Sequence, residues 1–102
     1  MKSGEDGIRI LSVWLIEGSR GGPTRAKILK LLKEKPHNTH QIAKALNLNY
    51  RTVMHHLEVL SRHGLVVKLS NNYGAPYILS PMARRHWNII EESIRRVDGD
   101  KQ

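Results

Sequence analysis

The residues best suited to specific chemistry form one polar run near the middle of the chain. Arg51 carries a planar guanidinium that can hold two acceptors at once, which suits the O6 and N7 atoms of guanine or a phosphate group. Met54 and His55 follow it, and they can meet a thymine methyl group and a base acceptor. The run therefore predicts contacts to double-stranded DNA by Asn49, Tyr50, Arg51, Thr52, Met54 and His55. The competing interpretation is an ordinary solvated helix face, in which Thr52 only supports the first helical turn.

A second polar cluster lies in the turn-rich stretch between Ser70 and Pro76. Asparagine side chains can bond to the acceptors of A·T pairs in a minor groove, and a nearby lysine can follow the phosphate backbone. These properties predict DNA contacts by Lys68, Asn71, Asn72 and Tyr73. The alternative is routine turn chemistry, because asparagine and glycine are the residues that a hairpin loop needs in any case.

Positive charge surrounds both clusters. The 102 residues include 17 Lys and Arg against 9 Asp and Glu, which gives a formal net charge of +8. Between Arg20 and Arg85 there are twelve basic residues and two acidic ones. A basic centre favours a polyanionic partner, although a solvated surface of a thermophilic or salt-adapted protein has a similar composition. Sequence-independent phosphate contacts are predicted for Arg20, Arg25, Thr39, His40 and Lys44.

Other kinds of chemistry are not indicated. The chain has no Cys, so it has neither a disulfide framework nor a thiolate metal site. Among the six histidines, the expected start of a helix separates His37 from His40, and His55 and His56 point in different directions on a helix. Paired acids, a phosphate-cradling glycine loop and an activated nucleophile are all missing. We therefore expect no metal, no cofactor and no enzymatic activity. Without a signal peptide or a membrane span, a cytoplasmic location is expected.

The elements that must position these residues form a helix-turn-helix with a wing. The pattern predicts a short helix over 39–46 and a longer one over 50–63, and the apolar stripe of the longer helix places the polar run on its opposite face. That stripe consists of Val53, Leu57 and Leu60. Two strands, 65–69 and 77–79, are expected to pair as a hairpin. The predicted fold is mainly α with a small β-hairpin wing (α+β), a winged helix-turn-helix.

Local signals mark the ends of these helices. Thr39 is expected to cap the first helix and Asn49 the second, since both side chains can accept hydrogen bonds from exposed amides. Asn47 tolerates the left-handed conformation that a tight turn between helices requires. Gly64 suits a positive φ at the end of the long helix.

Helical segments flank this unit. Residues 1–7 are polar and are expected to fray, and 8–17 is expected to be a helix, although its β-branched and aromatic content also suits a strand. Three glycines within 18–22 end that element. Another helix, expected over 23–35, buries the apolar residues Ile28, Leu29 and Leu32.

The C-terminal helix, which is expected to begin at Pro81, carries a long apolar seam. Its members recur at spacings of four, three, four and three, as in a coiled coil. In so short a protein we expect the seam to pair with a second copy, because a twofold dimer places two recognition helices about one turn of DNA apart. The predicted dimer interface comprises Leu11, Trp14, Leu15, Trp87, Ile90, Ile94 and Val97. The alternative is that the seam and both tryptophans pack inside the same chain.

The chain is expected to be one folded unit with three segments. Residues 1–22 form an N-terminal extension that contributes to dimerisation, 23–80 form the DNA-binding winged helix-turn-helix, and 81–102 form a C-terminal dimerisation helix.

The stretch QIAKALNLNYRTVMHHLEVLSRHGLVVKL resembles the DNA-binding core of ArsR-type winged-helix transcription regulators, archaeal ones in particular. The resemblance covers Thr24 to Leu79. It implies that His56 leans inward with a structural role, and that the residues at or near a DNA groove are Asn49, Tyr50, Arg51, Thr52, Met54 and His55. Metal-sensing members use a Cys pair on the recognition helix or acid and His ligands on the terminal helix. This chain lacks the Cys, and His86 lacks a comparable set of partners, so the resemblance does not extend to metal sensing.

The function expected from these observations is sequence-specific binding of double-stranded DNA by a homodimer that regulates transcription. The resemblance implies repression, by blocking access to a promoter. Two other classes remain: an architectural DNA-binding protein without sequence preference, and a winged helix used only for protein contacts. In the second class, Tyr50, Met54 and Tyr73 would form the contact patch.

Overall fold

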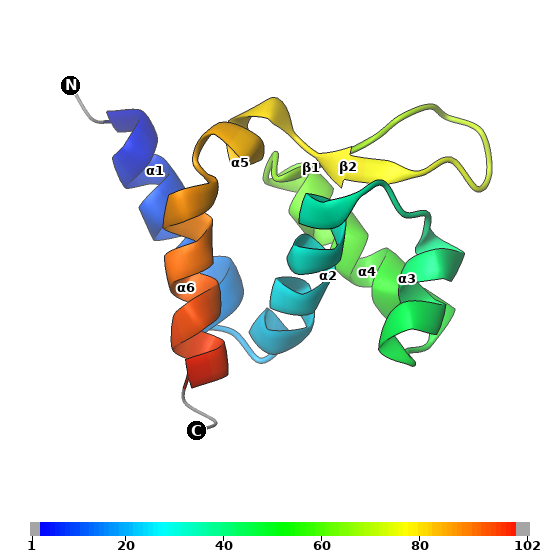
Figure 1. Cartoon of the computed structure of the whole chain (residues 1–102), viewed down its shortest axis with the longest axis horizontal. Helices are drawn as coiled ribbons and strands as arrows, with labels where there is room; N and C mark the ends of the chain where they lie inside the picture. Colours follow the sequence, from blue (N-terminus) through cyan, green and yellow to red (C-terminus); the bar gives the residue numbers. More distant parts are fainter. Residues whose placement is uncertain (1–2, 100–102) are drawn as a thin grey trace.

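The chain folds as a mainly helical molecule with one short β-hairpin (Figure 1). The computed structural model describes residues 3–99. In chain order, the elements are α1 (Ser3–Ser12), the π-helical turn η1 (Val13–Glu17), α2 (Gly22–Glu34), α3 (Thr39–Leu46), α4 (Tyr50–Arg62), β1 (Val66–Lys68), β2 (Tyr77–Leu79), α5 (Pro81–Arg85) and α6 (Trp87–Gly99). This arrangement confirms the predicted fold, a winged helix-turn-helix.

The turn between α3 and α4 is built as its sequence predicts. Asn47 adopts the left-handed conformation, with φ at 55°. The chain then reverses so tightly that the Leu48 amide donates to the Ala43 carbonyl at 2.9 Å. Asn49 caps α4, because its side-chain oxygen accepts a hydrogen bond from the Arg51 amide at 2.7 Å.

The start of α3 differs from the prediction, because Asn38 rather than Thr39 is the cap. The Asn38 side-chain oxygen accepts from the Gln41 amide, and the Gln41 side-chain oxygen accepts from the Asn38 amide, both at 2.8 Å. This reciprocal pair satisfies two amides that the helix leaves without partners. Thr39 is the first residue of α3 and is buried, with 8% of its surface exposed.

The wing is an antiparallel hairpin in which Val66 pairs with Leu79 and Lys68 with Tyr77. Its first strand is shorter than predicted by one residue at each end. Tyr77 also forms two backbone hydrogen bonds with His37, of 3.2 and 2.8 Å, which attach the hairpin to the segment between α2 and α3. The loop between the strands lies at the end of the molecule opposite α1 and α6 (Figure 1).

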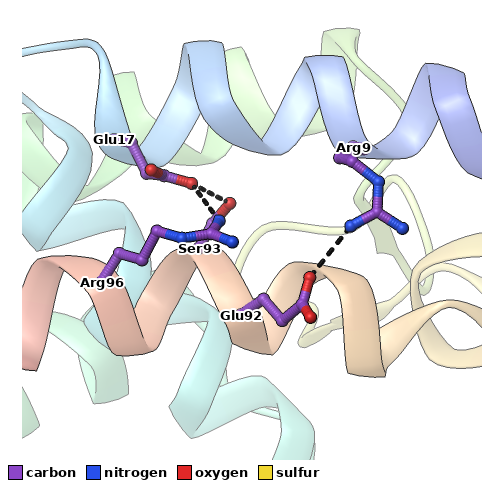
Figure 2. Close-up of polar contacts among 5 residues, drawn as sticks. All are labelled: Arg9, Glu17, Glu92, Ser93 and Arg96. Carbon is purple, nitrogen blue, oxygen red and sulfur yellow. Dashed lines mark hydrogen bonds and ion pairs between the residues drawn. The ribbon is translucent and has the colours of Figure 1, made fainter.

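α1 and α6 lie side by side (Figure 1). Figure 2 shows the polar contacts between them: Arg9 pairs with Glu92 at 2.9 Å, and Glu17 accepts from Ser93 at 2.6 Å and Arg96 at 3.0 Å. Ion pairs that are this exposed contribute only about 0–1 kcal/mol each. Apolar burial between the helices therefore supplies most of their attachment, and the polar contacts fix their relative position.

The two ends of the chain differ from the predictions in two respects. First, α1 already begins at Ser3, so 3–7 is helical rather than frayed, while residues 1–2 lie outside the described part. Second, the predicted C-terminal helix is divided into α5 and α6, with a break at His86. Ser80 caps α5 as its position before a proline indicates, because its hydroxyl accepts from the Ala83 amide at 3.0 Å.

One hydrophobic core joins the terminal helices to the helix-turn-helix. The predicted stripes of α2 and α4 are in it, and so are three residues that the sequence assigned to a dimer interface. Ile90 is fully buried, Ile94 and Leu15 almost fully. This corrects the prediction for these three residues, because contacts within one chain already cover them. Trp14 remains exposed, and Leu11, Trp87 and Val97 are half-buried.

The junction between η1 and α2 is especially close. Gly22 opens α2 against the backbone of Ile16, and a Cβ atom at Gly22 would lie 1.7 Å from the Ile16 carbonyl oxygen. Only glycine fits at this contact without a movement of the backbone.

Candidate DNA-binding surface

The outer face of α4 presents the predicted recognition residues to solvent. The opposite stripe of the helix, Val53, Leu57 and Leu60, is fully buried, and it fixes the rotation of α4 about its axis. The exposed residues on the outer face are Arg51, Thr52, Met54 and His55, and Tyr50 is half-buried beside them. These side chains come from the N-terminal half of α4, where a helix in a major groove meets base edges.

This face also includes Glu58, which the sequence analysis did not assign to the site. A hollow of about 440 Å³ is lined by Tyr50, Arg51, Met54, His55 and Glu58. Glu58 lies four residues after Met54 and seven after Arg51, so helical periodicity was the signal that could have found it. Its carboxylate can accept a hydrogen bond from the N4 amino group of cytosine.

The first turn of α4 is suited to anions. The Asn49 side-chain oxygen is occupied by the Arg51 amide, which leaves the Asn49 amino group free to donate outward. The first turn carries no acidic residue, so the positive end of the helix dipole is not neutralised there. A phosphate group at this end of α4 would meet backbone amides as well as the Asn49 side chain.

The wing tip is exposed and is attached to α3 and α4 by aromatic contacts. Tyr73 is 80% exposed, and its hydroxyl lies 2.8 Å from Nε2 of His40. The His40 ring in turn stacks at an angle on Tyr50, with 4.5 Å between ring centroids. Partial burial raises the pKa of Tyr50, and the nearby Tyr73 phenol raises it further. The Asn38 side chain adds a second attachment by donating to the Gly74 carbonyl at 3.2 Å.

The remaining wing residues lie where they were predicted. Lys68, Asn71 and Asn72 are exposed, and the Asn72 amide donates to the Ser70 hydroxyl at 3.2 Å. The loop therefore satisfies its own turn chemistry through the backbone, and both asparagine side chains remain directed to solvent.

Three of the predicted phosphate contacts are accessible and two are not. Arg20, His40 and Lys44 are exposed. Arg25 is only 6% exposed and Thr39 is buried at the start of α3, so neither can reach a phosphate group. Both predictions are corrected for the same reason, because each side chain packs inside the fold. Lys44 lies beside two polar residues that the sequence analysis did not assign, Lys35 and Gln41, around a hollow of about 420 Å³.

Arg25 is instead the centre of a buried polar cluster. Its Nε atom donates to the Leu15 carbonyl at 2.9 Å, NH2 donates to the Ser19 hydroxyl, and NH1 lies 3.1 Å from Nδ1 of His56. A guanidinium only donates, so Nδ1 of His56 accepts and the proton of a neutral ring is on Nε2. Burial lowers the pKa of His56, and the charges of Arg25 and His55 lower it further. Burial also lowers the pKa of Arg25.

The histidines do not gather around a common point. Within residues 3–99, no group of three or more His, Cys, Asp or Glu side chains is close enough to hold a metal ion. In the same part of the chain, no helix is both long and apolar enough to cross a membrane.

Comparison with known proteins relates this geometry to transcription regulators. Residues 22–68 match the family model described as "Bacterial regulatory protein, arsR family" (HTH_5), a span that runs from the start of α2 to the end of β1. No curated protein matches the sequence.

Several solved structures share the fold. Reduced HlyU from Vibrio cholerae N16961 matches with a TM-score of 0.64 and 21% identity, over 94% of this chain and 96% of HlyU. Lactococcus lactis ZitR matches with a TM-score of 0.58 and 20% identity, over 78% of this chain. ZitR in complex with DNA matches with a TM-score of 0.52 and 24% identity, over 78% of this chain and 61% of ZitR.

The lengths of these proteins differ. This chain spans 55% of the first ZitR structure, and it spans 55% of Staphylococcus aureus MarR, which it matches with a TM-score of 0.60. The chain thus has the winged-helix fold, and its residues 22–68 match the model of the arsR family of bacterial regulatory proteins.

Proposed function

We propose that this chain is a cytoplasmic, homodimeric regulator that binds specific double-stranded DNA sequences and represses transcription by covering promoter DNA. The observation that carries the proposal is the outer face of α4, which is held in solvent by a fully buried stripe on the opposite side. The basic residues around it are not neutralised within the chain: among residues 3–99, Arg20, Lys44, Arg51 and Lys68 form no ion pair with a carboxylate.

The dimensions of α4 support major-groove binding. Its 13 residues span roughly 20 Å at 1.5 Å per residue, and a major groove about 12 Å wide accepts a helix. In this position Arg51 pairs with guanine, while Met54, His55 and Glu58 face the neighbouring bases. Asn49 and Lys44 hold phosphates on either side, and the exposed asparagines of the wing follow the adjacent backbone or minor groove.

An apolar strip on α1 and η1 supports the homodimer. Ile10, Val13 and Trp14 share one side of this helical segment, and Trp14 is 70% exposed. Large apolar side chains that adjoin one another on a surface mark an interaction site more often than chance. We therefore propose that this strip and the half-buried Leu11 contact the second copy, in place of the residues of the predicted interface that are buried within the chain. In a twofold dimer built through this surface, we expect the two α4 helices to lie about one turn of DNA apart.

The decisive experiment is selection of bound duplexes from a random pool at moderate salt. A sequence-specific dimer enriches a motif with two related half-sites about ten base pairs apart. Tight, strongly salt-dependent binding without enrichment would indicate an architectural protein. Absence of duplex binding would indicate a protein-interaction module with Tyr50, Met54 and Tyr73 as its contact patch.

The dimer is tested separately by sedimentation. Val13→Glu introduces a charge into the apolar strip, and it should shift the chain to the monomer, whereas Val13→Ala should not. Val13 is exposed, so neither change disturbs the core. If the unmutated chain is already a monomer at working concentration, the dimer proposal is wrong.

A further inference from the structure

The outer face of α4 carries one residue whose charge is opposite to that of its surroundings. Between Lys35 and Ile90 the chain has seven Lys and Arg, and Glu58 is the only acidic residue. Glu58 is exposed, and it lines the same hollow of about 440 Å³ as Arg51 and His55. The only carboxylate of this long basic stretch therefore lies on the surface that is proposed to enter a major groove.

The carboxylate of Glu58 forms no ion pair with a basic residue among residues 3–99. Arg62 lies four residues later, at the spacing at which acidic and basic side chains pair on a helix, and one pair of this spacing does form on α6. Burial raises the pKa of Tyr77 and the charge of Glu58 raises it further, so Glu58 lies on the side of α4 that faces β2. Nothing in the described part of the chain therefore neutralises this carboxylate.

A carboxylate without a countercharge opposes DNA binding at this place. Phosphate backbones flank both sides of a major groove that is about 12 Å wide, so they repel a negative charge inside the groove from both sides. The carboxylate of Glu58 also loses water when a duplex covers α4, and a desolvated charge without a hydrogen bond is costly. A duplex that binds tightly therefore needs a hydrogen-bond donor opposite Glu58.

The four bases differ in whether they supply such a donor in the major groove. Guanine presents the acceptors N7 and O6, and thymine presents the acceptor O4. Adenine presents the N6 amino group beside the acceptor N7, whereas cytosine presents its N4 amino group with no acceptor beside it on the same base. A carboxylate is therefore attracted by cytosine, both attracted and repelled by adenine, and repelled by guanine and thymine.

We propose that Glu58 is a specificity-determining residue, which selects cytosine at one position of each half-site and rejects the other bases there; this rests on the proposed function. Arg51, which lines the same hollow seven residues earlier, pairs with guanine. Seven residues span roughly 10 Å of helix, and this length corresponds to about three base pairs at roughly 3.4 Å each. The expected half-site therefore contains a guanine and a cytosine about three base pairs apart. Because the phosphates repel Glu58 in every duplex that lacks this cytosine, the residue also weakens sequence-independent binding.

The test compares the unmutated full-length chain with the variants Glu58→Gln and Glu58→Ala. Each protein selects duplexes from a random pool, and its affinity is then measured for four duplexes that differ only at the selected cytosine. The unmutated chain should lose at least about fivefold in affinity with any other base at this position. Glu58→Gln should prefer adenine there, because a glutamine amide bonds to N6 and N7 of adenine together. Glu58→Ala should bind the four duplexes alike.

Two controls separate base recognition from a general effect of charge. Glu34→Gln removes a carboxylate from an exposed position on α2, and it should leave the base preference unchanged. On the DNA side, N4-methylcytosine keeps the base pair but replaces the amino hydrogen that faces the groove. It should weaken binding of the unmutated chain at least about fivefold and should leave binding of Glu58→Ala unchanged. The measurement with the unmutated chain and methylated DNA does not depend on the folding of any variant.

Two results would overturn the role of Glu58 alone. One is selection of the same motif by Glu58→Gln and by the unmutated chain, with an equal rise in affinity for all four duplexes, because Glu58 would then only repel DNA. The other is equal affinity of the unmutated chain for the cytosine and N4-methylcytosine duplexes. In both cases the unmutated chain still enriches a motif, so the proposed function stands. A pool in which the unmutated chain enriches no motif would instead overturn the proposed function and the role of Glu58 together.

Discussion

Substitution of Gly22 by alanine should remove a large part of the free energy of unfolding of this chain. The added Cβ would lie 1.7 Å from the carbonyl oxygen of Ile16, 2.6 Å from its carbon and 3.0 Å from its Cα. All three atoms belong to the backbone, so a rotamer change cannot relieve the contact. The start of α2 must withdraw from η1 by roughly 1.5 Å before ordinary van der Waals distances return.

The magnitude follows from what this withdrawal breaks. Overpacking of this kind costs about 1–3 kcal/mol, and loss of the 2.9 Å bond from Arg25 to the Leu15 carbonyl adds about 1.5–3 kcal/mol as a bond to a charged group. We expect a total of roughly 2.5–6 kcal/mol, against a stability of about 5–15 kcal/mol for a typical domain. The measurement is urea unfolding followed by circular dichroism and tryptophan fluorescence.

The matched control is Gly7→Ala. A Cβ atom at Gly7 meets nothing within 4 Å, and the residue lies inside α1. Alanine is the better helix former, so this variant should gain about 0.5–1 kcal/mol. If Gly22→Ala lost less than about 1 kcal/mol while the fold stayed intact, the close approach of α2 to η1 would not exist as described.

Four further predictions test the surface and the core. Arg51→Ala should lower specific DNA affinity by about 1–3 kcal/mol and relax the base preference in competition binding, and an unchanged preferred sequence would remove Arg51 from base readout. Lys44→Ala should weaken binding to all sequences alike and reduce the slope of log affinity against log salt by about one unit; a loss confined to specific sites would contradict a phosphate contact. Ser12→Ala should raise stability by about 1 kcal/mol, because the buried Ser12 hydroxyl has no hydrogen-bond partner within residues 3–99; a loss of stability in urea unfolding would point to a partner. His56→Gln should reduce the acid sensitivity of folding, because the pKa of His56 is lowered in the folded chain. The unfolded chain then takes up a proton near pH 6.5 that the folded chain does not, so wild-type stability falls as the pH drops below about 6.5, and parallel pH dependence in both proteins would refute this.

The helix-turn-helix could be predicted from sequence because its signals are local. The left-handed Asn47, the Asn49 cap and the end of α4 at Gly64 each depend on one residue and its immediate neighbours. The exposed face of α4 followed in turn from its buried stripe. Glu58 was not assigned to the site although its signal is equally local, because it lies one helical turn after Met54 on the same face of α4.

The terminal helices show where sequence patterns are insufficient. An apolar seam has the same periodicity whether it meets a second copy or another helix of its own chain, and here Ile90 and Ile94 pack within the chain, where α6 lies beside α1. The break at His86 carries no glycine or proline to announce it. Likewise, a positive charge predicts exposure, yet Arg25 is buried because the π-helical turn offers it the Leu15 carbonyl. The burial of Ile90, Ile94 and Arg25 depends on contacts with other elements of the chain, which a periodic pattern or a charge does not reveal.

The two attachments of the wing loop have a consequence for the kind of site the protein can accept. The hydrogen bonds between Tyr73 and His40 and from Asn38 to Gly74 join the loop to the start of α3, the helix that precedes α4. A free loop would lose conformational entropy on meeting DNA, at about 1–2 kcal/mol per residue fixed, whereas this loop is ordered beforehand. In the proposed binding mode, the distance between the DNA contact of α4 and the DNA contact of the wing is therefore fixed before DNA binds. We therefore expect DNA whose grooves already match that distance to bind without distortion, and stiff DNA that does not match it to bind weakly even when its bases are correct.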